Sequence, residues 1–538
     1  MLNPYQQIVS SLDLRAALKI ASRPSDLLPP RHEDKVTGEV GKRFTEHLAH
    51  NLGTSQYDPE LAPVIPVPKS SLTTRPARVL TLTDRVVYEA LVAPLRPRID
   101  AFLLGHEVIF WPRGTLSADK RWSDFEKSPL ASEKKYIVRA DIAGFYETVS
   151  HTRLTSAITN ATGYRDLASA LAHFLNRIMG SSRGLPQGLL SSDALATLSL
   201  AELDFAMVRH GFEYFRHGDD IRIAVATYGE GRAAIHRLES ELRRSAFLLN
   251  GAKTRILYAD TYEREMVRYE NALREAEEDA RSITVDALAD DPEALAAAMR
   301  AFDMEPLKWN LFYDDTDDFD DAIAELRLRI TPDIVSVAER LFMATYERRP
   351  GSKAPEGELS GRLFFQQLKG TLEKLSAGES PVAIPYVAVL LRSFPETTKI
   401  VCNYLRSLHG SDLEIANAID ESMVDESTEW ALAWMIRVLS TVPDAISEST
   451  VARVRACVER PWERWLVAVE AAKFLAAAGE LRRPELLRLW NTCPSVFRVD
   501  VAVAAALLRD SVPWAKAFAE AAKSDPVHGV AIRHVEHA

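Results

Sequence analysis

The sequence predicts an α+β first half followed by an all-α second half, and three observations support this division. In residues 1–260, short β-rich runs such as Tyr136–Ala140 and Ile221–Ala226 alternate with helical stretches. Residues 261–331 form a charged, helix-favouring bridge. From residue 332 to residue 538, apolar residues recur at helical spacing. With 538 residues, of which 47% are hydrophobic, the chain is long enough to bury more than one core.

The helical pieces of the second half are short and follow one another closely. Breakers such as Arg349-Pro350-Gly351 and Val442-Pro443-Asp444 separate them. The clearest pieces are residues 333–346, 359–375, 429–440 and 462–478. In such a series, each helix pair buries its apolar face on the next pair. Because no strict period is present, we expect an irregular HEAT-like array.

The net charge of −11 is unevenly distributed. Residues 1–260 have a small basic excess, and the rest of the chain carries all of the acidic excess. The first half is therefore compatible with a phosphate backbone, which binds to local basic grooves. The scattered cysteines, Cys402, Cys457 and Cys493, have no metal-ligand spacing and fit a reduced cytosolic protein. With neither a membrane-length apolar window nor a signal peptide, we expect a cytoplasmic protein without a membrane partner.

Three acidic residues form the candidate catalytic centre. Asp141 directly follows the apolar run Tyr136–Ala140, and Asp219 and Asp220 stand in a turn between two β-rich runs. A hairpin that offers adjacent carboxylates beside a strand-end Asp forms a compact acidic cluster. Two Mg²⁺ ions about 4 Å apart require such a cluster to clamp the attacking and leaving oxygens of phosphoryl transfer. We therefore predict two Mg²⁺ ions here, with Mn²⁺ as a substitute.

The order of these elements and their neighbours resembles the reverse transcriptase family over roughly residues 30–260. The elements in the palm region are Arg139-Ala140-Asp141 with Tyr146 and Ser150-His151, Gly184-Leu185-Pro186-Gln187-Gly188, Arg216-His217-Gly218-Asp219-Asp220, and Leu249-Asn250 with Lys253-Thr254. Upstream elements resemble the fingers of group II intron enzymes and comprise Pro66–Lys69, Thr74–Arg78, Asp84–Val87 and Trp111-Pro112-Arg113-Gly114. The resemblance implies a right-hand polymerase with fingers and palm in the first half.

Two departures from the family pattern affect the interpretation. His217 and Gly218 replace the usual Tyr and Ala, and the resulting Gly-Asp-Asp is the pattern of RNA-dependent RNA polymerases. Those enzymes place a second Asp about where Tyr146 stands, to engage the ribose 2′-hydroxyl. An aromatic ring at that position crowds the 2′ position and favours deoxynucleotides. We therefore expect DNA synthesis.

The resemblance also implies residue roles. Asp141 and Asp219 would ligate both metals, Asp220 would contribute more weakly, and Ile142 is included among the metal ligands. The expected nucleotide-binding residues are Lys69, Arg75 or Arg78 for the triphosphate, Tyr146 at the sugar, Pro186, Gln187 and Gly188 at the pocket floor, and Lys253 at the pyrophosphate. A plain surface charge is the alternative for each basic residue. His217 is expected to be a packed hairpin residue.

The layout as a whole looks like the bacterial abortive-infection (Abi) and defence-associated reverse transcriptases, in which a helical array follows a compact palm. This implies antiphage defence, with dNTPs as substrates and either a non-coding RNA template or template-independent synthesis. One alternative is a group II intron-like or other mobile-element enzyme, although no maturase or endonuclease segment is found. The other is a catalytically inactive palm that acts as an assembly scaffold.

Two further expectations follow from the resemblance. If synthesis is protein-primed, Tyr5 and Tyr57 are the candidate hydroxyl donors, because each was expected to lie on a mobile segment. Buried packing is the alternative role for both. A homo-oligomer is also expected, because the second half is rich in Trp, a residue enriched in helix cores and at interfaces. These residues are Trp430, Trp434, Trp462, Trp465, Trp490 and Trp514.

Overall fold

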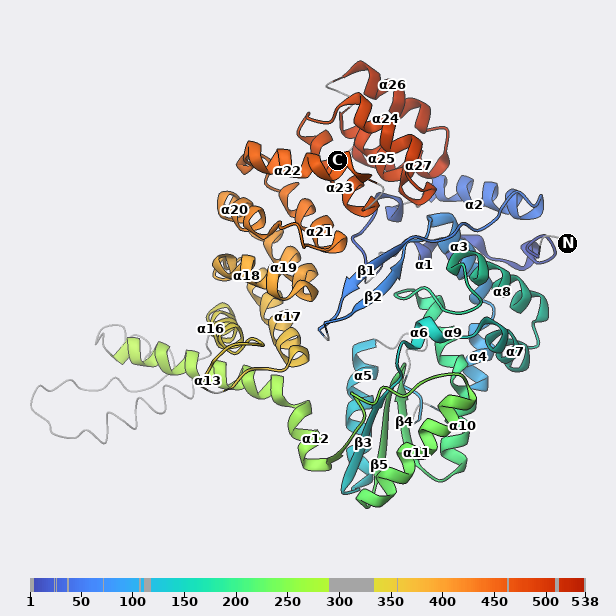
Figure 1. Ribbon diagram of the computed structural model, residues 1–538, viewed down its shortest axis with the longest axis vertical. Helices are drawn as coiled ribbons and strands as arrows, with labels where there is room; N and C mark the ends of the chain where they lie inside the picture. The colour runs from blue at the N-terminus through green and yellow to red at the C-terminus, as the bar shows by residue number, and fades with distance from the viewer. Residues whose placement is uncertain are drawn as a thin grey trace, which may run out of the picture.

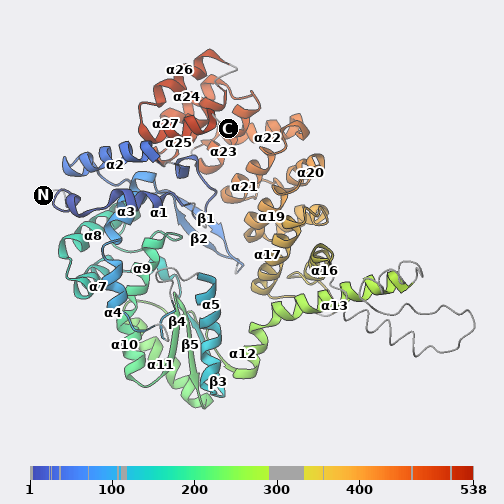
Figure 2. The same ribbon diagram turned by 180° about the vertical axis from the view of Figure 1, so that it is seen from behind.

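The computed structural model shows an α+β half and a curved array of helices that leaves it and returns to it (Figure 1). The array starts after helix α13 (Arg268–Ala289), and its last helix, α27 (Pro526–Glu536), contacts α2 (Gly38–Gly53) (Figure 2). The residues described are 4–23, 25, 27–35, 38–70, 72–105, 108–110, 118–289, 333–355, 357–461, 464–508 and 512–536. The Trp111–Gly114 element, the bridge from residue 290 onward and Trp462 lie outside them.

A four-stranded antiparallel sheet lies at the centre of the first half, with strand order β4-β5-β3-β6. The strands are β3 (Tyr136–Asp141), β4 (Glu213–His217), β5 (Asp220–Val225) and β6 (Arg255–Tyr258). The two predicted β runs are the inner strands β3 and β5. Helix α11 (Tyr228–Arg244) packs along the inner strands, and α10 (Ala201–Arg209), α5 (Ala118–Lys127) and α12 (Ala259–Met266) contact the sheet.

Helices cover the end of this sheet where β3 stops. They are α1 (Leu14–Ala21), α3 (Leu82–Val92), α4 (Arg96–Phe102), α6 (Phe145–Thr148), α7 (His151–Thr162), α8 (Arg165–Met179) and α9 (Leu190–Ser199). One continuous hydrophobic core joins them to β3 and β5, from Tyr5 to Phe247. The predicted α+β first half is confirmed, and its core fixes the strand ends that carry the acidic residues.

A separate antiparallel hairpin, β1 (Val64–Pro68) and β2 (Thr74–Arg78), belongs to a different core. Its inward residues Ile65, Val67 and Ala77 are buried together with the apolar side chains of the helical array. Strand β1 also contacts helix α21 (Glu429–Leu439) of the array. The predicted division at residues 260 and 332 therefore does not separate the cores, because part of the first half folds onto the second.

The array follows the all-α prediction throughout its described residues. Its helices are α16 (Ile334–Glu347), α17 (Gly361–Ala377), α18 (Val387–Ser393), α19 (Thr398–Leu405), α20 (Asp412–Ser422), α21, α22 (Glu448–Glu459), α23 (Trp465–Ala477), α24 (Arg483–Thr492), α25 (Ser495–Leu508), α26 (Pro513–Ala522) and α27. Helices α17, α19, α21, α23, α25 and α27 pack in series, each on the next, and the others lie beside them. None of the described helices is long and apolar enough to cross a membrane.

The tryptophans that suggested an interface lie within this array. Trp430 and Trp434 are 3% and 2% exposed, and Trp465, Trp490 and Trp514 pack against the same core. Trp430 and Trp434 are therefore helix-packing residues, whereas Trp465, Trp490 and Trp514 are partly buried.

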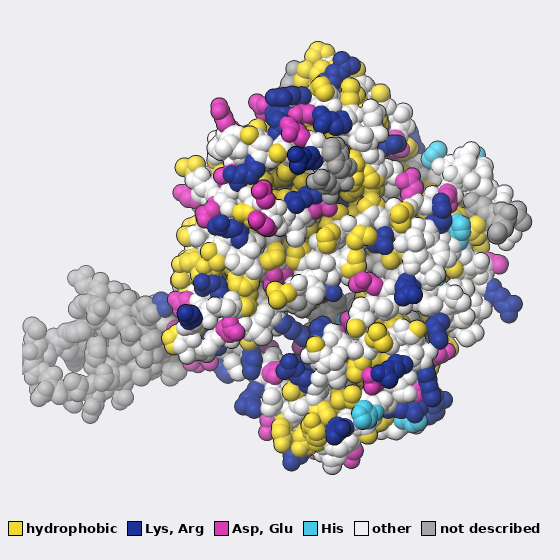
Figure 3. All heavy atoms as spheres, viewed as in Figure 1, with side chains coloured by type: hydrophobic (Ala, Val, Ile, Leu, Met, Phe, Trp, Pro, Cys, Tyr) yellow, Lys and Arg dark blue, Asp and Glu magenta, His cyan; other side chains and the backbone are white. Residues whose placement is uncertain are grey.

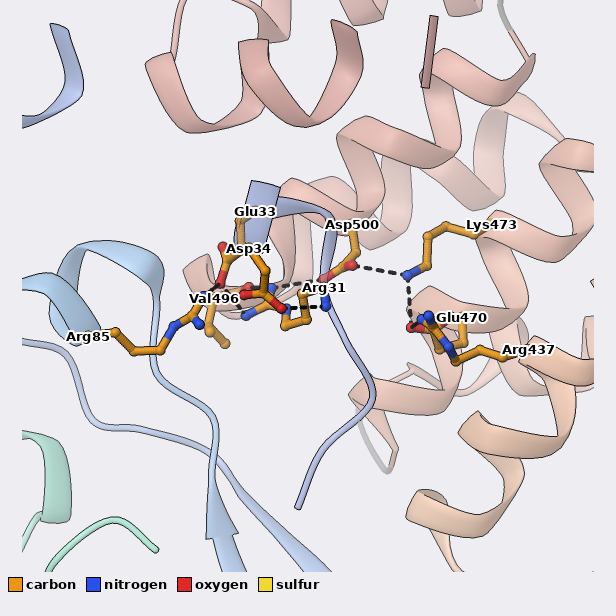
Figure 4. Close-up of polar contacts among 9 residues, drawn as sticks. All are labelled: Arg31, Glu33, Asp34, Arg85, Arg437, Glu470, Lys473, Val496 and Asp500. Atoms are coloured by element: carbon orange, nitrogen blue, oxygen red, sulfur yellow. Dashed lines mark hydrogen bonds and ion pairs between the residues drawn. The ribbon is translucent and has the colours of Figure 1, made fainter. Parts of the chain in front are cut away.

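A buried chain of alternating charges joins the first half to the array (Figure 4). Arg85 of α3 binds Glu33 and Asp34 at 2.9 and 2.8 Å, and Arg31 binds Glu33 at 3.0 Å. Arg31 also reaches Asp500 of α25 at 2.9 Å. These ion pairs continue into the array through Lys473, which lies 3.1 Å from Asp500 and 2.8 Å from Glu470. Glu470 in turn binds Arg437 at 3.2 Å. Each buried charge therefore has an opposite partner, as burial of ions requires.

Acidification from pH 7 to pH 5 is expected to weaken this junction through His32. Burial, with the nearby Lys473 charge, lowers the pKa of His32 to about 4, whereas an unfolded His titrates near 6.5. His32 therefore binds a proton more tightly in the unfolded chain than in the folded chain. The stabilisation that neutral, buried His32 gives to the folded chain is complete above pH 6.5 and is lost as the pH falls toward 4. The loss at pH 5 is at most about 2 kcal/mol. Urea denaturation at pH 7 and pH 5 measures this loss of unfolding free energy. The loss should be smaller in His32→Gln than in the wild-type protein. An equal loss in the two proteins would contradict the prediction.

Candidate active site

The three predicted carboxylates lie at adjacent strand ends. Asp141 is the last residue of β3 and is the antiparallel partner of Asp220, the first residue of β5. His217 pairs with Asp220 across the β4–β5 hairpin, so Gly218 and Asp219 form a two-residue turn. Gly218 has a φ of 60°, a left-handed conformation that glycine adopts without strain at the first turn position. This explains the departure from Ala noted in the sequence.

Protein groups already bind two of the carboxylates. Asp141 accepts hydrogen bonds from Lys253 and from the amide of Asn250, each at 2.9 Å. Asp220 lies 3.3 Å from the guanidinium of Arg222. Lys253 therefore binds Asp141 in this structure, and its place at the pyrophosphate stays a prediction. Its side chain is 58% exposed, so it is free to turn away from Asp141.

Asp219 is the least compensated of the three carboxylates. Burial and the charges of Asp220 and Asp141 raise its pKa to about 6, against a smaller opposing effect of Lys253. Mutual repulsion of this kind shows that the three carboxylates lie close together in space. A site with these properties attracts cations.

A buried ion pair that sequence reasoning missed holds the hairpin. Arg216 and Asp204 are both fully buried, and the guanidinium donates to both carboxylate oxygens, at 2.5 and 2.7 Å. Arg216 also donates to the carbonyl of Gly218 at 3.0 Å, and Tyr214 donates to Asp204 at 2.9 Å. The bidentate geometry fixes the turn that carries Asp219. The ion-pair partner of Arg216 is therefore Asp204 of α10, and not one of the two Asp residues that follow it in the sequence.

Two of the predicted phosphate-binding residues, Lys69 and Arg75, belong to the β1–β2 hairpin and its loop. Lys69 begins the loop of the β1–β2 hairpin, and its pKa is lowered by burial, by Arg75 and by Lys253, whereas Glu147 and Asp219 act in the opposite direction. These charges therefore lie within electrostatic range of one another. Figure 3 shows that Lys and Arg side chains also gather on the surface between the lower end of the array and the sheet.

Arg78 does not join this group. It donates to the carbonyls of Ala62 and Met179 at 2.8 and 3.3 Å, so its guanidinium is occupied by the fold. Alternation along β2 explains the difference, because residues three apart in a strand point to opposite faces. Arg75 is exposed, and it is the residue of the two that remains a triphosphate candidate.

Tyr146, the aromatic residue predicted to lie at the sugar, is fixed by hydrogen bonds at its hydroxyl and at its main-chain carbonyl. Tyr146 donates its hydroxyl to Asp193 at 2.7 Å, and burial together with the Asp193 charge raises the pKa of Tyr146. The Tyr146 carbonyl accepts from Leu185 at 2.8 Å, which attaches it to the Gly184–Gly188 element. Buried His151 binds the Gly184 carbonyl at 2.7 Å. Asp193 lies five residues after Gly188 and is not among the site residues predicted from the sequence.

The remaining predicted pocket residues follow in the same element. Pro186 is buried, Gln187 and Gly188 are half-buried, and Gly188 has a φ of 81°. Ile142 is 2% exposed with its side chain in the core. Because that side chain has no donor atom, Ile142 offers a metal only its main-chain carbonyl.

Residues 67–285 match the family model described as "Reverse transcriptase (RNA-dependent DNA polymerase)". This part of the chain is similar to the reverse transcriptase family. The match indicates an RNA-directed DNA polymerase, which is a nucleotidyltransferase. It includes every predicted carboxylate and extends through α12 into α13, beyond the predicted end of the palm at residue 260.

Solved structures provide only distant likenesses to this chain, and no curated protein matches it. The telomerase of Candida albicans, solved with a TWJ fragment of telomeric RNA, is 11% identical with a TM-score of 0.29, covering 77% of this chain and 67% of that one. The Candida tropicalis telomerase, solved with the same kind of fragment, is 10% identical with a TM-score of 0.31, covering 76% and 67%. Similarity at this level does not indicate a shared fold.

Asp141, Asp219 and Asp220 are the residues that would hold a divalent metal ion. Among the described residues, no three His, Cys, Asp or Glu side chains converge to hold an ion. The reason is visible in the contacts above, since Lys253 and Asn250 occupy Asp141 and Arg222 occupies Asp220. The residues nevertheless fit a divalent cation, because the donors are carboxylate oxygens and the raised pKa of Asp219 reflects negative charge without sufficient compensation.

The two predicted priming tyrosines, Tyr5 and Tyr57, are buried. Tyr5 is fully buried in the core of the first half, and Tyr57 is 8% exposed and donates to Asp84 at 2.7 Å. Burial raises the pKa of both phenols, which opposes deprotonation. The prediction that either lies accessible for priming is wrong for this structure, and the alternative of buried packing is confirmed.

Proposed function

We propose that the protein polymerises deoxynucleotides by two-metal-ion phosphoryl transfer at Asp141, Asp219 and Asp220. The observation that carries this proposal is the position of the three carboxylates at adjacent strand ends, with Lys69 of the β1–β2 hairpin loop within electrostatic range of Asp219. Two Mg²⁺ ions bound there supply Lewis-acid stabilisation of the attacking and leaving oxygens. Purified protein incubated with Mg²⁺, dNTPs and a primed RNA or DNA template should incorporate label, and its failure under all these conditions would reject the proposal.

The residues of the chain divide the remaining work. Arg75 and Lys69 bind the triphosphate charge from the hairpin loop. Lys253, which is 58% exposed, would neutralise the developing charge of the leaving group with its ammonium once it is released from Asp141. The Arg216–Asp204 pair keeps the Asp219 turn fixed throughout, so the carboxylates do not need to reorganise during the reaction.

Replacing Tyr146 with Ala is expected to increase rNTP use relative to dNTP use, on the order of 10-fold or more. The ring is held by Asp193 beside the Asp219 carboxylate, so its removal opens space at the 2′ position. The ratio of kcat/KM for the two nucleotides measures the effect. Tyr164→Ala is the matched control, because Tyr164 is 39% exposed and contacts Arg98 outside the pocket. An unchanged ratio in Tyr146→Ala would remove Tyr146 from the sugar site.

We also propose a role in antiphage defence of the abortive-infection type. Its support is the resemblance in layout, namely a reverse transcriptase domain followed by a long helical array that we assign as HEAT-like because its helices pack in series. Cells carrying the wild-type gene should resist phage, and cells carrying Asp219→Asn should not. Equal protection by both would favour the inactive-scaffold alternative. An intron or retroelement RNA encoded beside the gene would favour the mobile-element alternative.

The template and the assembly state belong to the same proposal. Nucleic acid that co-purifies with the protein should be either a defined non-coding RNA with complementary DNA or an untemplated DNA attached to the chain. Since Tyr5 and Tyr57 are buried, we favour the RNA-templated form. We expect a homo-oligomer, and mass photometry that finds only a 60.0 kDa monomer with and without nucleic acid would contradict it.

A further inference from the structure

One side chain of the helical array reaches into the reverse transcriptase half. Trp430 of α21 is 3% exposed, and its indole N–H donates to the main-chain carbonyl of Leu27 at 2.6 Å. The two residues are 403 positions apart in the chain. A buried hydrogen bond between such distant segments fixes their relative position, because breaking it leaves a desolvated group unpaired.

Leu27 in turn lies against the glycine of the proposed pocket floor. A Cβ atom at Gly188 would lie 3.3 Å from Leu27 Cγ and 3.3 Å from Ser25 Oγ, which is closer than ordinary contact. The Leu27 N–H donates to the same Ser25 hydroxyl at 3.2 Å. The segment around Leu27 is therefore held between α21 on one side and Gly188 on the other.

The opposite side of the pocket rests on the same array. Val67 and Ala77 of the β1–β2 hairpin are buried in the array's core, and β1 contacts α21, which lies beside it in Figure 1. At the hairpin tip, a Cβ atom on Gly361 of α17 would lie 2.9 Å from the Ser70 carbonyl, so the start of α17 abuts the loop that follows Lys69. Both walls that would hold a nucleotide are thus positioned by array helices.

We propose that Trp430 is a positioning residue for nucleotide binding: through the Leu27 carbonyl, the array sets the position of Gly188 in the pocket floor. The inference rests on the proposed function, because it assumes that the Gly184–Gly188 element binds the incoming dNTP. The helical array would then contribute to the affinity for dNTP, in addition to any contribution to assembly.

The chain offers a matched pair of variants for the test. Trp430→Phe keeps an aromatic ring and removes the indole N–H, and Trp434→Phe makes the same change at a second buried Trp of α21 whose ring centroid is 6.3 Å away. Within the described part of the chain, the Trp434 indole N–H has no hydrogen-bond partner. Leu27→Ala is a second test from the other side of the contact, because it removes the side chain that lies against Gly188.

The measurements are the Kd of a dNTP by equilibrium binding, its KM and kcat in incorporation, and the midpoint of chemical denaturation. We expect Trp430→Phe and Leu27→Ala to raise Kd and KM by about 10-fold with little change in kcat, a loss of about one good hydrogen bond. Trp434→Phe should leave Kd and KM at the wild-type values even if its stability falls equally. Equal Kd values for Trp430→Phe and Trp434→Phe would overturn the inference.

The outcome separates the inference from the proposed function. If wild-type protein binds dNTP without incorporating it, the proposed polymerisation fails and the Kd comparison still decides the role of Trp430. If wild-type protein binds no dNTP, both are overturned.

Discussion

Replacing Asp219 with Asn is expected to reduce Mg²⁺-dependent dNTP incorporation on the order of 10³-fold while the protein stays folded. The carboxylate stands in the hairpin turn beside Asp141 and Asp220, where a metal needs its charge, and the amide keeps the shape but not the charge. Because the pKa of Asp219 is raised to about 6, its ionised form is unfavourable in the folded chain at neutral pH. The denaturation midpoint should therefore stay the same or rise while activity is lost.

Asp166→Asn provides the comparison. Asp166 is an exposed carboxylate in the first turn of α8, in the same domain and outside the acidic cluster. It should keep wild-type incorporation at saturating Mg²⁺. If folded Asp219→Asn protein retained more than about a tenth of the activity, Asp219 would not be a metal ligand. Loss of activity in both variants would point to a general charge effect.

The acidic site was predictable because its information is local. An apolar run followed by Asp141, and an Asp pair between two β-rich runs, already specify a strand end and a hairpin turn. The antiparallel register then places Asp141 opposite Asp220. The same alternation of side chains along β2 could have separated Arg75 from Arg78 in advance, since the two residues are three apart.

The contacts that hold the site residues in place were not predictable from the sequence. Asp204 and Arg216 are charged residues, and in a sequence such residues are assigned to the surface, yet both are fully buried. Their pairing depends on how α10 packs on β4. Contacts such as Trp430 with Leu27 and Arg31 with Asp500 join segments more than 400 residues apart, and no spacing rule encodes them. The core shared by the β1–β2 hairpin and the array was missed for the same reason.

Replacing Asp500 with Ala is expected to destabilise the protein by about 3–5 kcal/mol, because it leaves Arg31 and Lys473 buried without their shared partner. Burial acts to raise the pKa of Asp500, but Lys473 and Arg31 outweigh it and hold that pKa below its usual range. The ionised form therefore stabilises the folded chain above that pKa. Urea denaturation at pH 7 should show a lower midpoint.

Glu239→Ala is the control, since Glu239 pairs with Arg243 on the exposed face of α11, and such pairs contribute about 0.5 kcal/mol or less. A loss in Asp500→Ala no larger than that of the control would mean that the Arg31–Asp500 contact does not hold the array. If the loss is large, it must also reach the active site, because Arg31 follows Leu27 by four residues and the Leu27 segment lies against Gly188. We expect the junction to open before the sheet unfolds, so nucleotide affinity in Asp500→Ala should fall at urea concentrations below those that unfold the sheet.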